Sequence, residues 1–227
     1  MMNEQDFLRR AFDERATAIL RTDDQQTAAR AMEAVVRAGF RNLEFTLSCP
    51  GVYELIEDFA KRDGLVVGAG TVLEPAQARR AVEAGASFVV SPATDEAVIR
   101  TALELGVVAM PGAYTATEMV LAQKAGAQLQ KLFPAPANGP EYARMLLGPL
   151  PGLRLVPTSG VTPENVGEWF AAGVFGVGWV ASLFDAEDLR AGRFDNIEER
   201  ARQCLTATRA ATRPQRDWGL VTAAATV

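Results

Sequence analysis

The chain has 227 residues, of which 48% are hydrophobic and 22% charged, and its net charge of -5 comes from acids and bases interspersed along the sequence. This composition is typical of a soluble globular protein, and without a basic stripe or arm we expect no nucleic-acid partner. No apolar run approaches the roughly 20 residues of a membrane span, and the N-terminus MMNEQDFLRR is too polar for a signal peptide, so we expect a cytoplasmic protein with no membrane partner.

Histidine is absent, and there are two cysteines, Cys49 and Cys204. The missing histidine excludes Ser/His/Asp triads, Cys/His pairs and most zinc chemistry. The cysteines have neither metal-ligand spacing nor a disulfide framework around them, so we expect two free thiols. If the protein is an enzyme, it works with carboxylates, lysine, hydroxyls or backbone groups.

Glycines punctuate the chain at near-constant intervals, and a short apolar run follows each one. Residues 1–15 predict a short helix, and ATAIL at 16–20 predicts the first strand. From there, segments with helical periodicity, such as TAARAMEAVVRA and ATEMVLAQKA, end at a glycine that introduces the next strand. These glycines, which we expect to adopt the left-handed conformation of helix C-caps, are Gly39, Gly64, Gly85, Gly106, Gly126, Gly152 and Gly173.

Eight predicted strands alternate with helices over residues 16 to about 205. Such alternation is typical of a parallel sheet, and a near-constant repeat favours a (β/α)8 TIM barrel over an open doubly wound sheet, which needs a change of direction. No composition break marks a second domain. The sequence therefore predicts one α/β domain over residues 1–227, with a short N-terminal helix and a helical C-terminal tail at 208–227.

Polar residues lie late in several predicted strands, where the chemistry of such barrels is found. The hydroxyl residues could instead cap the helices that follow. GAGTV could cradle a phosphate, but it is weak evidence for a nucleotide because Leu73 replaces the third glycine of GxGxxG. The polar residues are Glu44 and Thr46 in NLEFTL, Thr71 in VVGAGTV, Ser91 in FVVSP, Lys131 in LQKLFP and Thr158 in LVPTSG.

Lys131 stands in an otherwise apolar strand. It could form a structural ion pair with Glu44, but a buried pair seldom improves on apolar packing for stability. Burial disfavours the ammonium form of a lysine, and a neutral amine attacks carbonyls to form a Schiff base that accepts electrons from a breaking carbon–carbon bond. Glu44 is the acid placed to move protons, and hydroxyls and N–H groups around Thr71 would hold a substrate carboxylate.

The order of these motifs resembles one family. From about Ala18 to Leu183 the chain is similar to the class I pyruvate aldolases that cleave 2-keto-3-deoxy-6-phosphogluconate (KDPG) and 2-keto-4-hydroxyglutarate (KHG), and LSCPG and ANGPEY are similar to the neighbouring phosphogalactonate aldolases. The resemblance implies a metal-independent homotrimer with no cofactor beyond a covalent imine. The motifs are LEFTL, VGAGTVL at 67–73, VVSPATD at 89–95, MPGAYT, KLFPA at 131–135 and PTSGVTPEN at 157–165.

The resemblance also implies a role for each matched residue. Lys131 would be the Schiff-base lysine and Glu44 the general acid/base in the cleavage of a 2-keto acid to pyruvate and an aldehyde. The substrate-binding residues would be Thr71 and Gly70 at the carboxylate, Pro92 and Phe133 along the pyruvate pocket, Thr158 and Arg21 nearer the hydroxyl-bearing end, and Ser159, Gly160 and Ser182 in the loops after the last two strands.

The likeness is weaker where a phosphate would bind. Relatives usually have T-G-G after strand seven, G-S after strand eight and an arginine in place of Ser48, whereas this chain has Thr158-Ser159-Gly160 and Val180-Ala181. An aldolase for a phosphorylated sugar acid and one for an unphosphorylated acceptor such as glyoxylate both stay open, and we favour the second for the physiological role. A non-catalytic or isomerase-type phosphate-binding barrel is the alternative from another class, and it leaves Lys131, Glu44 and Thr71 together unexplained.

Overall fold

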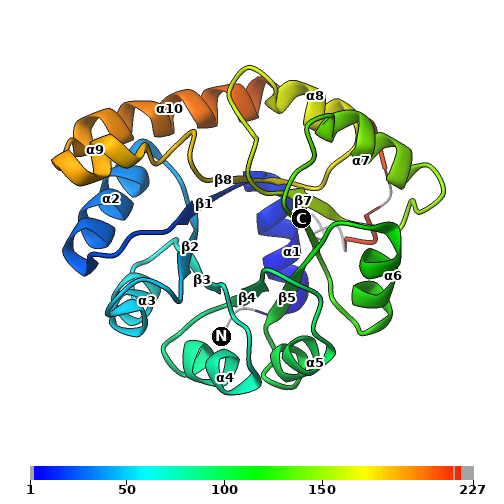
Figure 1. The fold of residues 1–227 in the computed structure, drawn as a ribbon, viewed down its shortest axis with the longest axis horizontal. Helices are drawn as coiled ribbons and strands as arrows, with labels where there is room; N and C mark the ends of the chain where they lie inside the picture. The colour runs from blue at the N-terminus through cyan, green and yellow to red at the C-terminus, as the bar shows by residue number, and fades with distance from the viewer. Residues whose placement is uncertain (1–2, 217, 221–227) are drawn as a thin grey trace, which may run out of the picture.

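The fold is a nearly closed barrel of parallel strands surrounded by helices (Figure 1). A computed structural model describes residues 3–216 and 218–220. Eight strands form one sheet in the order β7-β6-β5-β4-β3-β2-β1-β8, and β7 and β8 approach each other at an isolated bridge between Thr158 and Gly178. The predicted (β/α)8 barrel is therefore confirmed.

The strands and helices alternate as predicted. The strands are β1 (Ala16–Leu20), β2 (Asn42–Thr46), β3 (Val66–Gly70), β4 (Phe88–Ser91), β5 (Val108–Ala113), β6 (Gln130–Leu132), β7 (Leu155–Pro157) and β8 (Val177–Trp179). The helices are α1 (Glu4–Glu14), α2 (Gln25–Ala38), α3 (Val52–Ala60), α4 (Pro75–Glu83), α5 (Glu96–Glu104), α6 (Ala116–Lys124), α7 (Gly139–Leu147), α8 (Val166–Ala171), α9 (Ala186–Ala191) and α10 (Phe194–Ala210).

Most of the glycines that end helices adopt the predicted conformation. A positive φ is found at Gly39, Gly64, Gly85, Gly106, Gly126 and Gly173. The prediction is wrong for Gly152, because α7 ends at Leu147, its C-cap is Gly148, and Gly152 lies in the loop beyond it.

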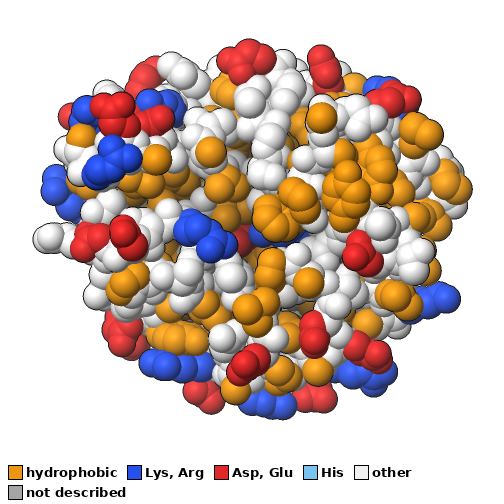
Figure 2. Space-filling view, viewed as in Figure 1, with side chains coloured by type: hydrophobic (Ala, Val, Ile, Leu, Met, Phe, Trp, Pro, Cys, Tyr) orange, Lys and Arg blue, Asp and Glu red, His pale blue; other side chains and the backbone are white. Residues whose placement is uncertain are grey.

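Charged side chains of both signs surround the face seen in Figure 1, and no large patch of one sign covers it (Figure 2). This mixture follows from the interspersed acids and bases of the sequence. Within residues 3–216 and 218–220, no helix combines the length and the apolar character needed to cross a membrane. Cys49 and Cys204 are buried free thiols, as predicted.

Two apolar layers hold the barrel together. The larger one lies between the sheet and the outer helices. The smaller one fills the N-terminal end of the barrel, where Phe7 and Leu8 of α1 pack with strand residues such as Phe88 and Phe175, and where Trp218 adds its ring. Since α1 lies across this end of the barrel (Figure 1), the strand N-termini are closed to solvent and the opposite end is left for the site.

The described residues after α10 pack against the N-terminal end of the barrel. Its predicted helical character is wrong beyond Ala210, because residues 211–216 and 218–220 have no helical structure: Ala211 is extended, and Pro214 disfavours a helix at the residue before it. Positions 217 and 221–227 of the predicted tail lie outside the described residues. We call residues 211–216 and 218–220 the tail strap.

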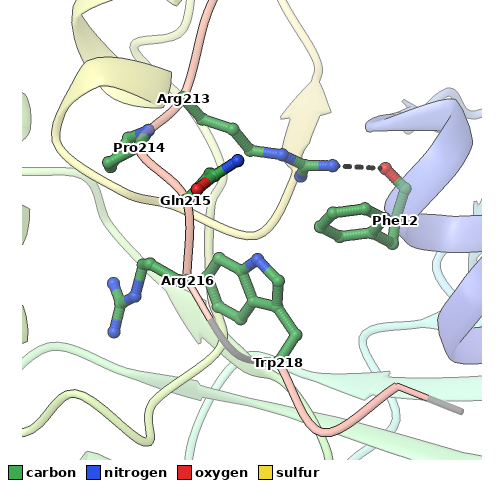
Figure 3. Close-up of a pocket in the computed structure, with 6 residues that line it drawn as sticks. All are labelled: Phe12, Arg213, Pro214, Gln215, Arg216 and Trp218. Carbon is green, nitrogen blue, oxygen red and sulfur yellow. Dashed lines mark hydrogen bonds between the residues drawn. The ribbon is translucent and has the colours of Figure 1, made fainter.

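Arginines fasten the tail strap to the barrel (Figure 3). Arg213 donates from Nη1 to the carbonyl of Phe175 and from Nη2 to that of Phe12, both at 3.0 Å, while its guanidinium stacks 3.4 Å from the Phe12 ring centroid. The Trp218 ring meets Phe175 edge-on at 5.2 Å between centroids. The tail strap is thus part of the seal on the N-terminal end, and it borders a pocket of about 550 Å³.

Removing the Trp218 ring should therefore destabilise the whole barrel. Trp218 is 8% exposed, and truncating a buried aromatic ring costs about 3–5 kcal/mol, so we expect Trp218→Ala to lower the free energy of unfolding by about 3 kcal/mol in a urea titration. Gln215→Ala, at an exposed position of the same tail strap, is the matched control and should change it little. Equal stability of the two variants would show that the tail strap does not seal the barrel.

Candidate active site

Lys131 and Glu44 meet across the interior of the barrel. Lys131 lies in β6 and Glu44 in β2, two strands that β3, β4 and β5 separate in the sheet. Lys131 is 7% exposed and Glu44 0%, and 3.8 Å separates Lys131 Nζ from Glu44 Oε1. The closed barrel therefore brings the predicted nucleophile and the predicted proton carrier into one buried pair.

The Glu44 carboxyl group lies in an environment with opposing electrostatic effects. Neither oxygen has a hydrogen-bond partner among the described residues, and burial raises the pKa of Glu44 while the charges of Lys131 and Arg21 act to lower it. A buried carboxyl group with a raised pKa that is not tied to other donors has the features of a group that takes up and releases protons in a reaction.

Gly70 gives the Glu44 carboxylate its room. A Cβ at Gly70 would stand 2.0 Å from Glu44 Oε1, so any side chain there would push the carboxyl group out of its position. Gly70 is the last residue of β3 and pairs with Thr46 of β2, the strand that carries Glu44. The family resemblance implied that Gly70 lies at the substrate carboxylate. The structure shows in addition that Gly70 borders the carboxyl group of Glu44.

Thr71 follows Gly70 in a strained conformation. Its φ is 62°, which a β-branched residue adopts rarely and which turns the hydroxyl away from the strand direction. Arg21 Nη2 donates to Thr71 Oγ1 at 3.0 Å, and because a guanidinium has no acceptor, the Thr71 hydroxyl proton is left to donate elsewhere. The arrangement presents a fixed hydroxyl donor beside Glu44.

Phe133 borders the Lys131 amine, and Pro92 packs against the strand beside it. The centroid of the Phe133 ring is 5.1 Å from Lys131 Nζ. The Pro92 carbonyl packs against Gly112, where a Cβ would come within 2.3 Å of its oxygen, and Gly112 is the β5 partner of Lys131 in the sheet. The Phe133 ring therefore lies near the Lys131 amine, whereas the carbonyl of Pro92 contacts the residue that pairs with Lys131.

The residues predicted after β7 and β8 hold the loops together in this structure. Ser159, with φ of 71°, accepts from the Ala135 N–H at 3.4 Å, and Gly160 also has a positive φ. Ser182 Oγ donates to the Val161 carbonyl at 2.7 Å. Thr158 is buried at the end of β7, with its Oγ1 3.5 Å from the Val156 carbonyl. Roles for these four residues in substrate binding stay a prediction.

A pocket of about 620 Å³ lies beside Thr71, and Arg21, which donates to the Thr71 hydroxyl, is one of the residues that line it. Ser48, after β2, and Arg190, on α9, also line it. Sequence reasoning did not select Arg190, because α9 follows the eighth strand and an isolated arginine there has the pattern of an ordinary exposed helix residue. No signal in the sequence alone would have placed it beside Arg21.

Among residues 3–216 and 218–220, no group of three or more His, Cys, Asp and Glu side chains could hold a metal ion. The polar groups that meet at this end of the barrel are instead an amine, a carboxyl group, a guanidinium and hydroxyls. They suit covalent attack on a carbonyl and transfer of protons.

Comparisons with known proteins agree with this chemistry. The family model for KDPG and KHG aldolases matches residues 9–200. The chain is 37% identical to the 2-dehydro-3-deoxy-6-phosphogalactonate aldolase of Escherichia coli, over 85% of this chain and 92% of that protein, and 36% identical to the KHG/KDPG aldolase of the same organism, over 76% and 82%. A KDPG aldolase structure from Legionella pneumophila, with pyruvate captured at low pH as a covalent carbinolamine intermediate, superposes with a TM-score of 0.76 at 25% identity, over 85% of this chain and 95% of that one.

The raised pKa of Glu44 predicts a pH-dependent cost to stability. As the pH rises above 4.5, the unfolded chain loses this proton before the folded protein does, so folding becomes less favourable. Glu44→Gln cannot ionise, and we therefore expect it to unfold at a higher urea concentration than the wild type at pH 7, with the difference shrinking as the pH is lowered to 4.

Glu83→Gln is the control for this measurement, because Glu83 is exposed and its replacement should have a small effect at both pH values. A Glu44→Gln variant that is less stable than the wild type at pH 7, or a difference that does not change with pH, would contradict the prediction.

Proposed function

This chain belongs to the KDPG and KHG aldolase family, and from that premise we propose that Lys131 and Glu44 carry out its reaction. The protein is a class I aldolase, a carbon–carbon lyase that forms a Schiff base and cleaves a 2-keto-3-deoxy or 2-keto-4-hydroxy acid to pyruvate and an aldehyde. The observation that carries the assignment is the buried Lys131–Glu44 pair, with 3.8 Å between Nζ and Oε1.

Lys131 supplies the nucleophile. Its Nζ adds to the 2-keto carbon of the substrate to give a carbinolamine, and Glu44 gives a proton to the departing hydroxyl, so that loss of water leaves a protonated imine and a Glu44 carboxylate. The buried position of Lys131, 3.8 Å from Glu44 Oε1, supports this role. The positive imine that follows lies beside the Glu44 carboxylate, which stabilises it.

Glu44 then moves the protons. Its carboxylate takes the proton of the C4 hydroxyl, the C3–C4 bond breaks, and the bonding electrons pass through C3 to the imine nitrogen. The aldehyde leaves, and the neutral enamine regains a proton at C3 from Glu44. Water then hydrolyses the imine, which releases pyruvate and restores the Lys131 amine.

Thr71 and its neighbours position the pyruvate half. The Thr71 hydroxyl proton is available for the substrate carboxylate, since Arg21 occupies an oxygen lone pair. Phe133 lies 5.1 Å from the Lys131 amine and, with Pro92, would fix the plane of the pyruvyl group. Gly70 admits both the carboxyl group of Glu44 and the substrate.

Thr158 and the loops after β7 and β8 would face the far part of the substrate. Ser159, Val180 and Ala181 stand where relatives present glycines and a serine, so fewer backbone N–H groups are open to a phosphate there. This difference supports an unphosphorylated acceptor at those loops, with Gly160 and Ser182 as further contacts. The covalent imine on Lys131 would serve in place of any added cofactor, and a cytoplasmic location stays a prediction.

A homotrimer is also part of the proposal. Tyr114, Leu121 and Met145 are large hydrophobic side chains with exposed fractions of 41%, 54% and 67%, and Tyr114 stacks on Tyr142 of α7. Hydrophobic side chains gather on the side of the molecule where α6 and α7 lie (Figure 2). Contact between copies would remove this apolar surface from water.

Charges at this surface should separate the copies. We expect the wild type to have the mass of a trimer by size-exclusion chromatography with light scattering, and the double variant Leu121→Glu, Met145→Glu to have that of a monomer. Gln203→Glu, on the exposed side of α10, should leave the mass unchanged. A monomeric wild type, or a trimeric double variant, would contradict the proposal.

Trapping the imine tests the catalytic assignment. After incubation with pyruvate and borohydride, we expect one pyruvyl adduct, on the peptide that contains Lys131, by intact and peptide mass spectrometry. Lys131→Ala should lose the adduct, and the control Lys124→Ala, in the last turn of α6, should keep it. No adduct on the wild type would reject the proposed function.

Glu44→Gln separates proton transfer from covalent attack. General acid–base catalysis contributes about 10²–10⁴-fold, so we expect the cleavage rate of KHG or KDPG to fall by that factor in a coupled assay of pyruvate release. An unchanged cleavage rate would show that another group moves the proton.

A further inference from the structure

Arginine and hydroxyl side chains line the pocket beside the catalytic pair. It has a volume of about 620 Å³, and Arg21, Ser48 and Arg190 are among the residues that line it. Arg21 connects it to the site through the bond to Thr71 Oγ1. Ser48 connects it through its Oγ, which lies 3.0 Å from Oγ1 of Thr46, two residues beyond Glu44 on β2. A molecule held at Lys131 could therefore extend into this pocket.

Two guanidinium groups in this pocket have no carboxylate partner among the described residues. Arg21 is exposed, and its recorded bond is the one to the Thr71 hydroxyl. Arg190 is exposed on α9 and takes part in none of the ion pairs formed by Arg193 and Arg200 nearby. Unpaired arginines that line one cavity provide planar donors for an oxyanion.

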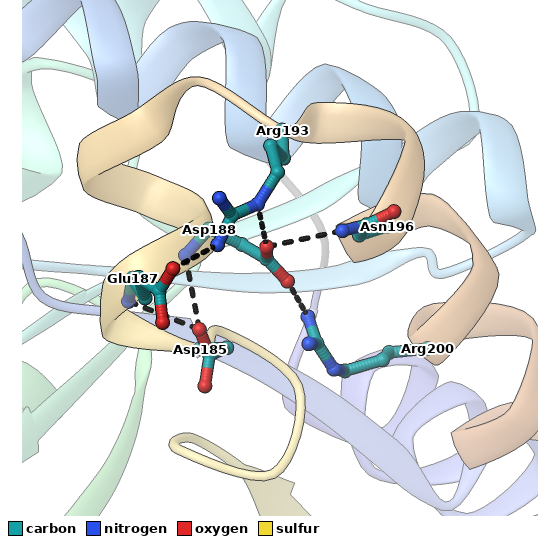
Figure 4. Close-up of polar contacts among 6 residues, drawn as sticks. All are labelled: Asp185, Glu187, Asp188, Arg193, Asn196 and Arg200. Atoms are coloured by element: carbon teal, nitrogen blue, oxygen red, sulfur yellow. Dashed lines mark hydrogen bonds and ion pairs between the residues drawn. The ribbon is translucent and has the colours of Figure 1, made fainter.

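The acids around α9 are engaged with one another's backbone and with Arg193, Asn196 and Arg200 (Figure 4). Asp188 is buried, accepts from Arg193 Nε at 2.5 Å and from Asn196 Nδ2 at 3.0 Å, and also pairs with Arg200. The bond from Arg193, followed by that from Asn196, lowers the pKa of Asp188 to about 2, so it stays ionised at neutral pH.

Glu187 pairs with Arg193 at 2.8 Å, and Asp185 caps the first turn of α9. This network fixes α9 against α10 and uses the carboxylates that could otherwise pair with Arg190. The Arg190 guanidinium is thus left for a ligand on a rigid support.

Two aspartates also line the pocket and limit where an anion can lie. Asp24 caps α2, with its Oδ1 accepting from the Thr27 N–H at 2.6 Å, a bond that helps to keep its pKa low. Asp23 is exposed, and no hydrogen bond of its side chain is found in the described part of the chain. An anion would be repelled from these carboxylates, and a hydroxyl could donate to Asp23.

We propose that Arg190 is a specificity-determining residue which, together with Arg21, binds an oxyanion at the far end of the aldehyde half of the substrate. The proposal rests on the function proposed above and adds the location and charge of the distal group. It accounts for the altered loops after β7 and β8, because the distal group would be held by guanidinium side chains from α9 and the end of β1. A carboxylate and a phosphate both present the anionic oxygens that guanidinium groups bind.

Condensation of pyruvate with three aldehydes tests this proposal and separates the two anions. Glyoxylate carries a carboxylate, glyceraldehyde 3-phosphate a phosphate, and glyceraldehyde neither, and pyruvate consumption is measured for each. We expect the wild type to prefer at least one anionic aldehyde over glyceraldehyde. The preferred anion identifies the group that the pocket takes.

In Arg190→Ala we expect KM for the preferred anionic aldehyde to rise about tenfold, the effect of one lost charge-assisted hydrogen bond, with kcat/KM for glyceraldehyde unchanged. Arg190→Lys should restore part of the loss, and Asp23→Asn should lower KM for the anion at low salt. Arg209→Ala, an exposed arginine on α10 outside the pocket, is the matched control.

Three results would overturn the proposal: a wild type with no preference for an anion, an Arg190→Ala variant that keeps the preference, or an equal loss with glyceraldehyde. Borohydride trapping of pyruvate needs no distal group, so wild type and Arg190→Ala should form the same adduct. If the wild type forms no adduct, the proposed aldolase function fails. If the adduct forms but the anion preference does not depend on Arg190, only the present proposal fails.

Discussion

The site depends on keeping Lys131 and Glu44 close together and out of water. Glu44 is fully buried, its oxygens have no hydrogen-bond partner among the described residues, and burial raises its pKa despite two neighbouring cations. Such a carboxyl group is a cost to folding. A packed apolar pair would stabilise the barrel at least as well, so the presence of this pair indicates selection for reactivity.

The rest of the barrel makes this pair possible. Glycine at position 70 leaves the volume that the Glu44 carboxyl group occupies. At the N-terminal end, α1 and Trp218 of the tail strap complete an apolar seal, so water reaches the interior from the other end. The unusual backbone of Thr71 and Ser159 lies at that open end, where strain is tolerated because the strands below are well packed.

Much of the fold could be predicted from the sequence, as could the two residues that we propose as the catalytic pair, for reasons that are local. The alternation of helices and apolar runs requires only short-range periodicity, and it predicted a (β/α)8 barrel. Lys131 and Glu44 were recognisable because a charged residue within an apolar strand is unusual wherever its partner lies. The helical tail was predicted incorrectly, because contacts of Arg213 and Trp218 with distant segments decide the conformation there.

The sequence by itself determined the fold class, through its repeating pattern, and the class of reaction, through the resemblance of its motifs to a family of Schiff-base aldolases. Only the tertiary structure decided which groups meet. Closing the sheet brings Lys131 of β6 to Glu44 of β2, and the Asp188 network holds α9 so that Arg190 lines a pocket with Arg21. Those distances depend on packing between segments far apart in the chain, and no local pattern encodes them.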